Sequence, residues 1–189
     1  INDWLDDMPD KLLPVLEYIA ERKLYLDYYP LYWTPKIGFS NRVIVPFIKD
    51  GINVGYTARA IGDAKPKYIS EQQPGYVFNL DNQNNSNREF VIVCEGPFDA
   101  LSIDACALLG AEIKDSQNWL LKQLGKEIIL VPDRDHEGPR TVEQAIEYGW
   151  SVSFPLWLET CKDINEAVIK YGRLFVIKTI LDSIESNKL

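Results

Sequence analysis

Four acidic residues follow two apolar stretches of this chain, at residues 90–94 and 127–131: Glu95, Asp99, Asp133 and Asp135. The two side chains of an Asp-x-Asp pair just beyond a strand can converge on one cation, and hard carboxylate oxygens are the ligands that Mg²⁺ prefers. Carboxylates placed this closely repel one another, so without a cation at least one of them should have a raised pKa. The four residues therefore predict a divalent-metal site.

Helix capping is the alternative interpretation of the same residues. Acidic side chains are common N-caps, so Asp99 or Asp135 could cap the helix that follows its strand. The pattern Glu-Gly-x-x-Asp after one strand and Asp-x-Asp-x-x-Gly after the other favours a metal site over capping alone.

The elements that must position these residues follow from the spacing of apolar side chains. Short apolar runs predict strands at residues 90–94, 127–131 and 150–154, and helical patterns occupy residues 99–109, 116–124, 141–148, 163–171 and 174–184. Strands that alternate with helices in this way are typical of βαβ units and a parallel sheet. Ligands bind at the carboxyl ends of the strands in such sheets, which is where the acidic residues lie.

The first part of the chain has a different pattern. We expect an amphipathic helix at residues 14–24, irregular packing at 25–35, and a β-hairpin formed by residues 42–48 and 52–61 around the turn Lys49-Asp50-Gly51. The polar run at residues 81–88 marks a boundary between lobes or an exposed loop. The predicted fold class is α/β: a parallel sheet flanked by helices, preceded by a smaller α+β lobe.

Composition limits the class of protein. The 189 residues are 46% hydrophobic and 25% charged, which is typical of a globular protein. No apolar stretch approaches the ~20 residues that span a bilayer, and the acidic start does not look like a signal peptide, so we expect a cytoplasmic protein without a membrane partner. The chain begins with Ile1, which suggests a piece of a longer polypeptide, and its three cysteines predict buried free thiols rather than a zinc ribbon or disulfides.

The net charge of −8 argues against nucleic-acid binding over the whole surface. The charge is uneven, however, because five basic residues stand against two acidic ones in one short segment: Arg42, Lys49, Arg59, Lys65 and Lys67 against Asp50 and Asp63. The segment predicts a local basic surface. A solvated strand face is the alternative for its basic residues.

The acidic motifs resemble those of the toprim domain, which bacterial-type DNA primases, topoisomerases and some nucleases share. Its marks are a Glu-Gly after one hydrophobic strand, here Glu95-Gly96, and an Asp-x-Asp-x-x-Gly after another, here from Asp133 to Gly138. The Asp four residues after the Glu, at Asp99, is the primase form of the first motif.

The basic segment is similar to the one that precedes toprim in replicative primases. There an Arg precedes a strand ending in Pro-hydrophobic, as Arg42 does, a second Arg sits in a Gly-rich strand, as Arg59 does, and Pro-Lys-Tyr follows, as at Lys67. Lys162-Asp163-Ile-Asn165 resembles a third primase motif, in which the family has a second Asp at the position of Asn165. That departure would weaken the ligand or replace it with an amide oxygen.

The resemblance implies an enzyme: a DNA primase core, a nucleotidyltransferase of the DNA-directed RNA polymerase type. It would join nucleoside triphosphates into RNA primers on a single-stranded DNA template. It would use two ions of Mg²⁺ or Mn²⁺ and would have a replicative helicase as a partner. It implies a basic α+β lobe over residues 1–82, a toprim domain over 83–170 and a C-terminal helix over 171–189. A toprim nuclease that hydrolyses phosphodiesters and a non-catalytic toprim module that binds nucleic acid are the alternatives.

The resemblance also implies a role for each residue. Glu95, Asp133, Asp135 and Asp163 would be metal ligands, with Glu95 a candidate general base as well. Glu95, Asp99, Asp133 and Asp135 would be the catalytic residues, and within this set Asp99 would support the ligands from behind. Three basic residues would complete the site on the other side of the cleft: Arg42, Arg59 and Lys67. They would hold nucleotide phosphates or the template backbone.

Overall fold

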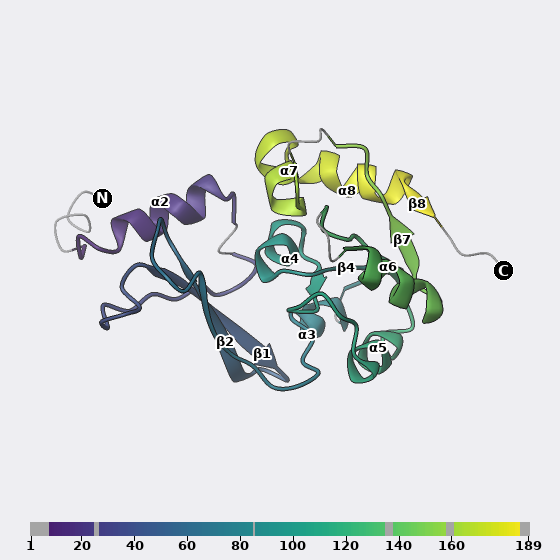
Figure 1. Ribbon diagram of the computed structural model, residues 1–189, viewed down its shortest axis with the longest axis horizontal. Coiled ribbons are helices and arrows are strands. Elements are labelled where there is room, and N and C mark those ends of the chain that lie inside the picture. Colours follow the sequence, from purple (N-terminus) through teal and green to yellow (C-terminus); the bar gives the residue numbers. More distant parts are fainter. Residues whose placement is uncertain (1–7, 25–26, 85, 135–137, 158–160, 186–189) are drawn as a thin grey trace.

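The strands form two sheets, and each sheet lies in its own lobe (Figure 1). The computed structural model describes residues 8–24, 27–84, 86–134, 138–157 and 161–185. The N-terminal lobe contains a helix and the three-stranded sheet β1-β2-β3: α2 Leu13–Glu21, β1 Arg42–Lys49, β2 Ile52–Ala60 and β3 Tyr68–Glu71.

The C-terminal lobe is built around the five-stranded sheet β5-β4-β6-β7-β8. Its strands are β4 Phe90–Cys94, β5 Cys106–Ala107, β6 Glu127–Leu130, β7 Ser151–Ser153 and β8 Ile184–Glu185. Its helices are α3 Leu80–Asn84, α4 Pro97–Ile103, α5 Asp115–Lys122, α6 Gly138–Glu147, α7 Ile164–Tyr171 and α8 Arg173–Asp182. The first four strands are parallel and β8 is an antiparallel edge, so the predicted α/β class is confirmed.

A tight turn sets the register of the β1–β2 hairpin. Asp50 and Gly51 have φ angles of 53° and 74°, as a two-residue hairpin turn of type I′ requires. Lys49 therefore pairs with Ile52, and a register shift between Phe47 and Ile48 brings Arg42 opposite Ala60 at the far end. The predicted hairpin is confirmed, and β3 extends it from β2 at a segment for which the sequence predicted no strand.

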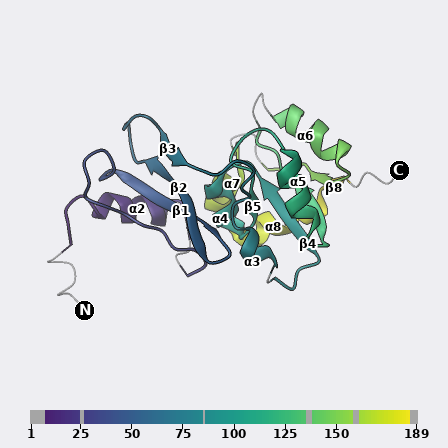
Figure 2. The same cartoon turned by 90° about the horizontal axis from the view of Figure 1, so that it is seen from below.

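Side chains of β4 alternate between two hydrophobic clusters, because successive residues of a strand point to opposite faces of the sheet. Ile92 packs with α4, α7 and α8 on one face, and Val91 and Val93 pack with α5 and α6 on the other. Figure 2 shows α5 and α6 on the opposite side of the sheet from α8. Burial on both faces is typical of parallel strands and explains their continuous apolar runs.

One of these clusters also joins the two lobes. Val45 and Phe47 of β1 belong to the same buried cluster as Ile92 of β4 and Val176 of α8. Phe78, on the connection between the lobes, lies 4.8 Å from Tyr29 and 6.1 Å from Phe47 between ring centroids. The lobes therefore share one core. The predicted domain boundaries, between residues 82 and 83 and between residues 170 and 171, stay a proposal. Helix α8, which begins just after the second boundary, packs against α4 and α7 within the C-terminal lobe.

The predicted helix at residues 99–109 is too long. Helix α4 ends at Ile103 because Asp104 adopts a left-handed conformation with φ of 56°, where the Asp104 carboxylate accepts hydrogen bonds from Asn79 and Gln83 and pairs with Arg88. The chain then runs back along the sheet as β5, parallel to β4. Contacts from a distant segment thus override the local helical pattern.

The exposed-loop interpretation of residues 81–88 is wrong at residues 81–84, which lie in helix α3. Gln83 is 1% exposed, and its side-chain amide donates to the Asp104 carbonyl over 3.0 Å. The prediction of buried free thiols is confirmed at Cys94, Cys106 and Cys161. Within the described part of the chain, no helix has the length and apolar character needed to cross a membrane.

Candidate active site

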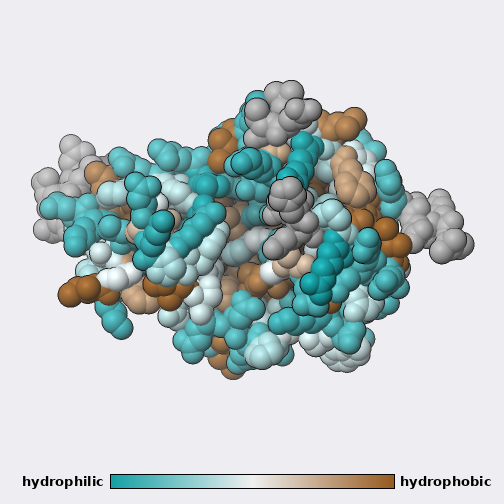
Figure 3. Space-filling model, viewed as in Figure 1, coloured by the Kyte–Doolittle hydropathy of each residue, from teal (hydrophilic) through white to brown (hydrophobic). Residues whose placement is uncertain are grey.

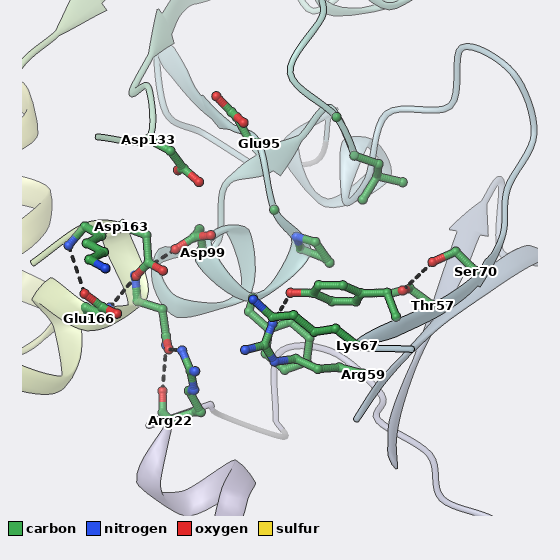
Figure 4. Close-up of a pocket in the computed structure, with 18 of the residues that line it drawn as sticks. Arg22, Thr57, Arg59, Lys67, Ser70, Glu95, Asp99, Asp133, Asp163 and Glu166 are labelled. Atoms are coloured by element: carbon green, nitrogen blue, oxygen red, sulfur yellow. Dashed lines mark hydrogen bonds between the residues drawn. The ribbon is translucent and has the colours of Figure 1, made fainter. Parts of the chain in front are cut away.

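A pocket of about 690 Å³ lies where the two lobes meet. In its lining, an acidic wall from the C-terminal lobe faces a basic wall from the N-terminal lobe (Figure 4), and Arg134 and Lys162 of the C-terminal lobe line it as well. The acidic wall consists of Glu95, Asp99, Asp133, Asp163 and Glu166, and the basic wall of Arg22, Arg59 and Lys67. The face of the molecule seen in Figure 3 is mostly hydrophilic, with apolar residues in small separate groups.

The turn from β4 into α4 positions Glu95 and Asp99. Glu95 directly follows β4, and Gly96 is the N-cap of α4. A Cβ atom on Gly96 would lie 2.9 Å from Oδ2 of Asp99, so the glycine of this motif leaves room for the Asp99 carboxylate. Asp99 is 6% exposed and lies beneath Glu95 and Asp133 in Figure 4. Asp99 therefore lies behind the two carboxylates that are nearer to the open pocket.

Burial raises the pKa of Asp99 well above its usual range, and the negative charges of Asp163 and Asp133 raise it further. Burial also raises the pKa of Asp163. These shifts agree with the sequence prediction that carboxylates clustered without a cation would be harder to ionise. The acidic wall thus concentrates negative charge at one place, as a cation site requires.

Two loops bring Asp133 and Asp163 to the pocket. Asp133 lies just beyond β6, and Asp135 lies outside the described residues. Asp163 is the N-cap of α7, where its carboxylate accepts a hydrogen bond of 2.7 Å from the backbone N–H of Glu166. Asp163 therefore acts as a helix cap and also lines the pocket.

Asn165 is used differently from the metal ligand that the sequence suggested. It is 1% exposed, and its Oδ1 accepts a 2.8 Å hydrogen bond from Arg22 of the N-terminal lobe. Its Nδ2 donates to the Arg22 carbonyl over 2.8 Å and to Ser102 Oγ over 2.7 Å. Its backbone N–H donates to Oδ1 of Asp99 over 2.8 Å. The side chain of Asn165 thus connects the two lobes, and its backbone orients Asp99.

The predicted basic residues separate into two groups. Arg59 and Lys67 line the pocket, as the sequence suggested. Arg42 does not: it is 3% exposed, and its guanidinium donates to the carbonyls of Gly38 over 2.9 Å and Ala58 over 3.2 Å. The structure gives Arg42 a role in fixing the start of β1 rather than one in the cleft.

Aromatic side chains surround Arg59. Its guanidinium carbon lies 6.0 Å from the ring centroid of Tyr18, 5.0 Å from that of Tyr68 and 5.4 Å from that of Phe98. Its nitrogens donate to both tyrosine hydroxyls. These contacts hold a planar cation at the edge of the pocket.

Several of these contacts were missed from the sequence. Tyr18 and Arg22 belong to α2 and its end, where an amphipathic pattern indicates only a buried face. Glu166 follows Asp163 by three residues, which is the spacing of a capping interaction and a signal that was available. Arg22 had no such signal, since its partner Asn165 lies 143 residues away.

The donor set of the acidic wall fits a divalent cation of the Mg²⁺ type. Among the residues that the structure describes, no three acidic, His or Cys side chains are grouped closely enough to hold a metal ion by themselves. Mg²⁺ is usually held by one or two carboxylates together with waters and substrate phosphates rather than by an all-protein cage. Glu95 and Asp133, both partly exposed at the pocket, suit that mode of binding.

Comparisons with known proteins agree with the site. Residues 92–168 match a family model described as toprim-like. The chain is 29% identical over 163 residues to the DNA primase of Thermotoga maritima, which covers 77% of this chain and 29% of that protein. It is 31% identical over 166 residues to the DNA primase of Rickettsia bellii, which covers 75% of this chain and 27% of that protein.

A solved structure of the DnaG primase catalytic domain bound to single-stranded DNA has a similar fold. The TM-score is 0.74 at 17% identity, over 93% of this chain and 76% of that one. The chain is thus toprim-like over residues 92–168. Within that class it is similar, across both of its lobes, to the catalytic core of DNA primases. It spans less than a third of the length of the curated primases named above.

Proposed function

We propose that this chain is the catalytic core of a DNA primase. In this role it joins ribonucleotides into short RNA primers on a single-stranded DNA template, which makes it a nucleotidyltransferase. The observation that supports this most directly is the pocket between the lobes, where a wall of carboxylates faces Arg59 and Lys67. A reaction that transfers a nucleotidyl group needs both, since cations hold the phosphates and carboxylates hold metal ions.

The carboxylates in the proposed mechanism are Glu95, Asp133, Asp135 and Asp163. These residues would hold two Mg²⁺ or Mn²⁺ ions, which would lower the pKa of the attacking 3′-hydroxyl and neutralise the charge of the leaving pyrophosphate. Glu95 would also accept the proton of that hydroxyl. Asp99, fixed by the backbone N–H of Asn165, supports this set from behind.

The basic wall has the complementary task. The guanidinium of Arg59 is planar and presents several N–H groups in a fixed fork, which matches the geometry of phosphate oxygens. Its aromatic neighbours limit the directions that the fork can take. Lys67 is exposed and adds a second positive charge. Together they hold the triphosphate or the template backbone opposite the acidic wall.

Partners follow from this proposal. The DnaG domain of similar fold binds single-stranded DNA, and we propose the same template here, with nucleoside triphosphates as substrates. A replicative helicase and a cytoplasmic location belong to the same proposal. A binding assay with purified helicase would test the first, and fractionation of cells would test the second.

Primer synthesis is the direct test. The full-length protein is incubated with single-stranded DNA, labelled ribonucleotides and Mg²⁺ or Mn²⁺, and the products are separated by length. We expect short RNA products from the wild type. Asp133→Asn should abolish them while leaving the thermal unfolding curve in EDTA close to that of the wild type, because Asp133 is partly exposed. DNA cleavage in place of synthesis would instead identify a toprim nuclease and refute the proposal.

A further inference from the structure

A backbone hydrogen bond joins the two loops that present Asp133 and Asp163. The backbone N–H of Arg134 donates to the carbonyl of Lys162 over 3.1 Å. Arg134 directly follows Asp133, and Lys162 directly precedes Asp163. The two bonded residues thus each adjoin one carboxylate of the acidic wall, so this bond holds the backbone beside Asp133 close to the backbone beside Asp163.

The side chain of Arg134 reinforces this connection. Its guanidinium donates to the carbonyl of Pro155 over 2.6 Å and to that of Trp157 over 3.3 Å, and lies 5.7 Å from the Trp157 ring centroid. Trp157 is 8% exposed, and its indole N–H donates to Thr179 of α8 over 2.9 Å. Arg134 therefore ties the loop after β6 to the segment that leads from β7 towards α7, and that segment is anchored on α8.

We propose that Arg134 is a positioning residue that holds Asp133 and Asp163 at the separation a divalent cation needs. The inference rests on the metal site of the proposed function. Arg134 is the middle residue of the Asp-x-Asp motif, a position to which the motif assigns no residue type and no role. Arg134 acts through the two carboxylates, and its role depends on a fork that reaches two carbonyls at once.

The chemistry of the side chain distinguishes Arg from its conservative replacement. A guanidinium presents five N–H donors in a rigid plane, whereas the ammonium of Lys is a single point at the end of a flexible chain. Lys at position 134 keeps the charge and the backbone N–H, and loses the simultaneous contacts with Pro155 and Trp157. Arg134 is an exposed residue, so its replacement should leave the fold intact and change the geometry of the acidic wall.

Mn²⁺ binding to the full-length protein, measured by titration calorimetry, is the first test. We expect Arg134→Ala to weaken Mn²⁺ binding about tenfold, which is the range for residues that orient metal ligands. Arg134→Lys should give an intermediate loss. Arg140→Ala is the matched control, because Arg140 is an exposed arginine nearby that pairs with Glu112 over 2.9 Å, and it should bind Mn²⁺ as the wild type does.

Primer synthesis at varied Mn²⁺ provides the second readout. For Arg134→Ala, the half-saturating Mn²⁺ concentration should rise about tenfold while kcat at saturating Mn²⁺ returns towards that of the wild type. A purely structural role would instead lower the melting temperature in EDTA and leave the Mn²⁺ midpoint unchanged, which would overturn the inference.

Asp133→Asn separates failure of this inference from failure of the proposed metal site. If Asp133→Asn binds Mn²⁺ as tightly as the wild type, the metal site itself is wrong and the inference falls with it. If Asp133→Asn loses Mn²⁺ while Arg134→Ala and Arg134→Lys keep it, the site stands and only the role of Arg134 is refuted.

Discussion

Replacement of Asn165 by Asp tests whether this position is a connection between lobes or a metal ligand. Asp has almost the same shape as Asn, and its carboxylate would be the better ligand for Mg²⁺. The structure nevertheless predicts that Asp at position 165 makes the protein less stable than Asn does. The side-chain amide of Asn165 donates two hydrogen bonds, to the Arg22 carbonyl and to Ser102 Oγ, and a carboxylate can donate neither.

The expected loss follows from these contacts. Each lost donor costs about 1 kcal/mol net in a typical case. The new charge is buried at a site that is 1% exposed, and pairing with Arg22 offsets that desolvation only in part. We therefore expect Asn165→Asp to lower the free energy of unfolding by at least about 2 kcal/mol. For a chain of 189 residues this corresponds to a fall in melting temperature of about 4–8 °C.

Thermal unfolding in EDTA, followed by Mn²⁺ titration of the folded protein, measures both consequences. Asn87→Asp is the matched control, because Asn87 is exposed and its replacement makes the same chemical change at the surface. It should leave the melting temperature unchanged. A higher melting temperature for Asn165→Asp, or an additional bound Mn²⁺ ion, would show that position 165 faces a cation and that its role as a connection between the lobes is wrong.

Three further predictions concern other residues of the pocket and its support. Arg59→Lys should raise the KM for nucleotide about tenfold in the primer assay, equal to about 1.4 kcal/mol, because Lys cannot present the fork that Tyr18 and Tyr68 hold; an unchanged KM would contradict this. Arg42→Met should lower the free energy of unfolding by about 3 kcal/mol, since two hydrogen bonds from a buried cation are lost. The folded protein should keep its affinity for single-stranded DNA. Weaker DNA binding without a change in stability would show that Arg42 acts in the cleft after all. Without metal, stability should fall as pH rises from about 4 through the raised pKa of Asp99, because the folded state holds a proton that the unfolded chain has already released. Asp99→Asn should flatten that part of the profile in EDTA melts, and an unaltered slope would show that Asp99 does not cause it.

Much of the fold could be predicted from the sequence where the signals are local. Runs of apolar residues identified β1, β4 and β6, and a rough alternation of apolar and polar residues identified β2. The short strands had no such signal. β5 and β8 have two residues each, and they are strands only because neighbouring segments offer backbone partners.

The candidate site divides in the same way. Glu95 and Asp133 could be found because each follows an apolar strand, and parallel strands bring their carboxyl ends to one edge. The roles of Arg42 and Asn165 could not be found, because motif position does not tell whether a side chain faces a cleft or a neighbouring backbone. Arg42 satisfies the carbonyls of Gly38 and Ala58, and only the packed structure decides that.

The connection between α2 and α7 has a consequence for how the protein is made. Arg22 bonds to a residue 143 positions later, and Lys23 donates to the carbonyl of Ile169, 146 positions later. A ribosome that adds about 5–20 residues per second needs roughly 7–30 s to cover that interval. The hairpin of the N-terminal lobe is complete long before, because its partners are local. The nascent chain therefore carries the hairpin with Arg59 well before Asp163 and Glu166 complete the acidic wall.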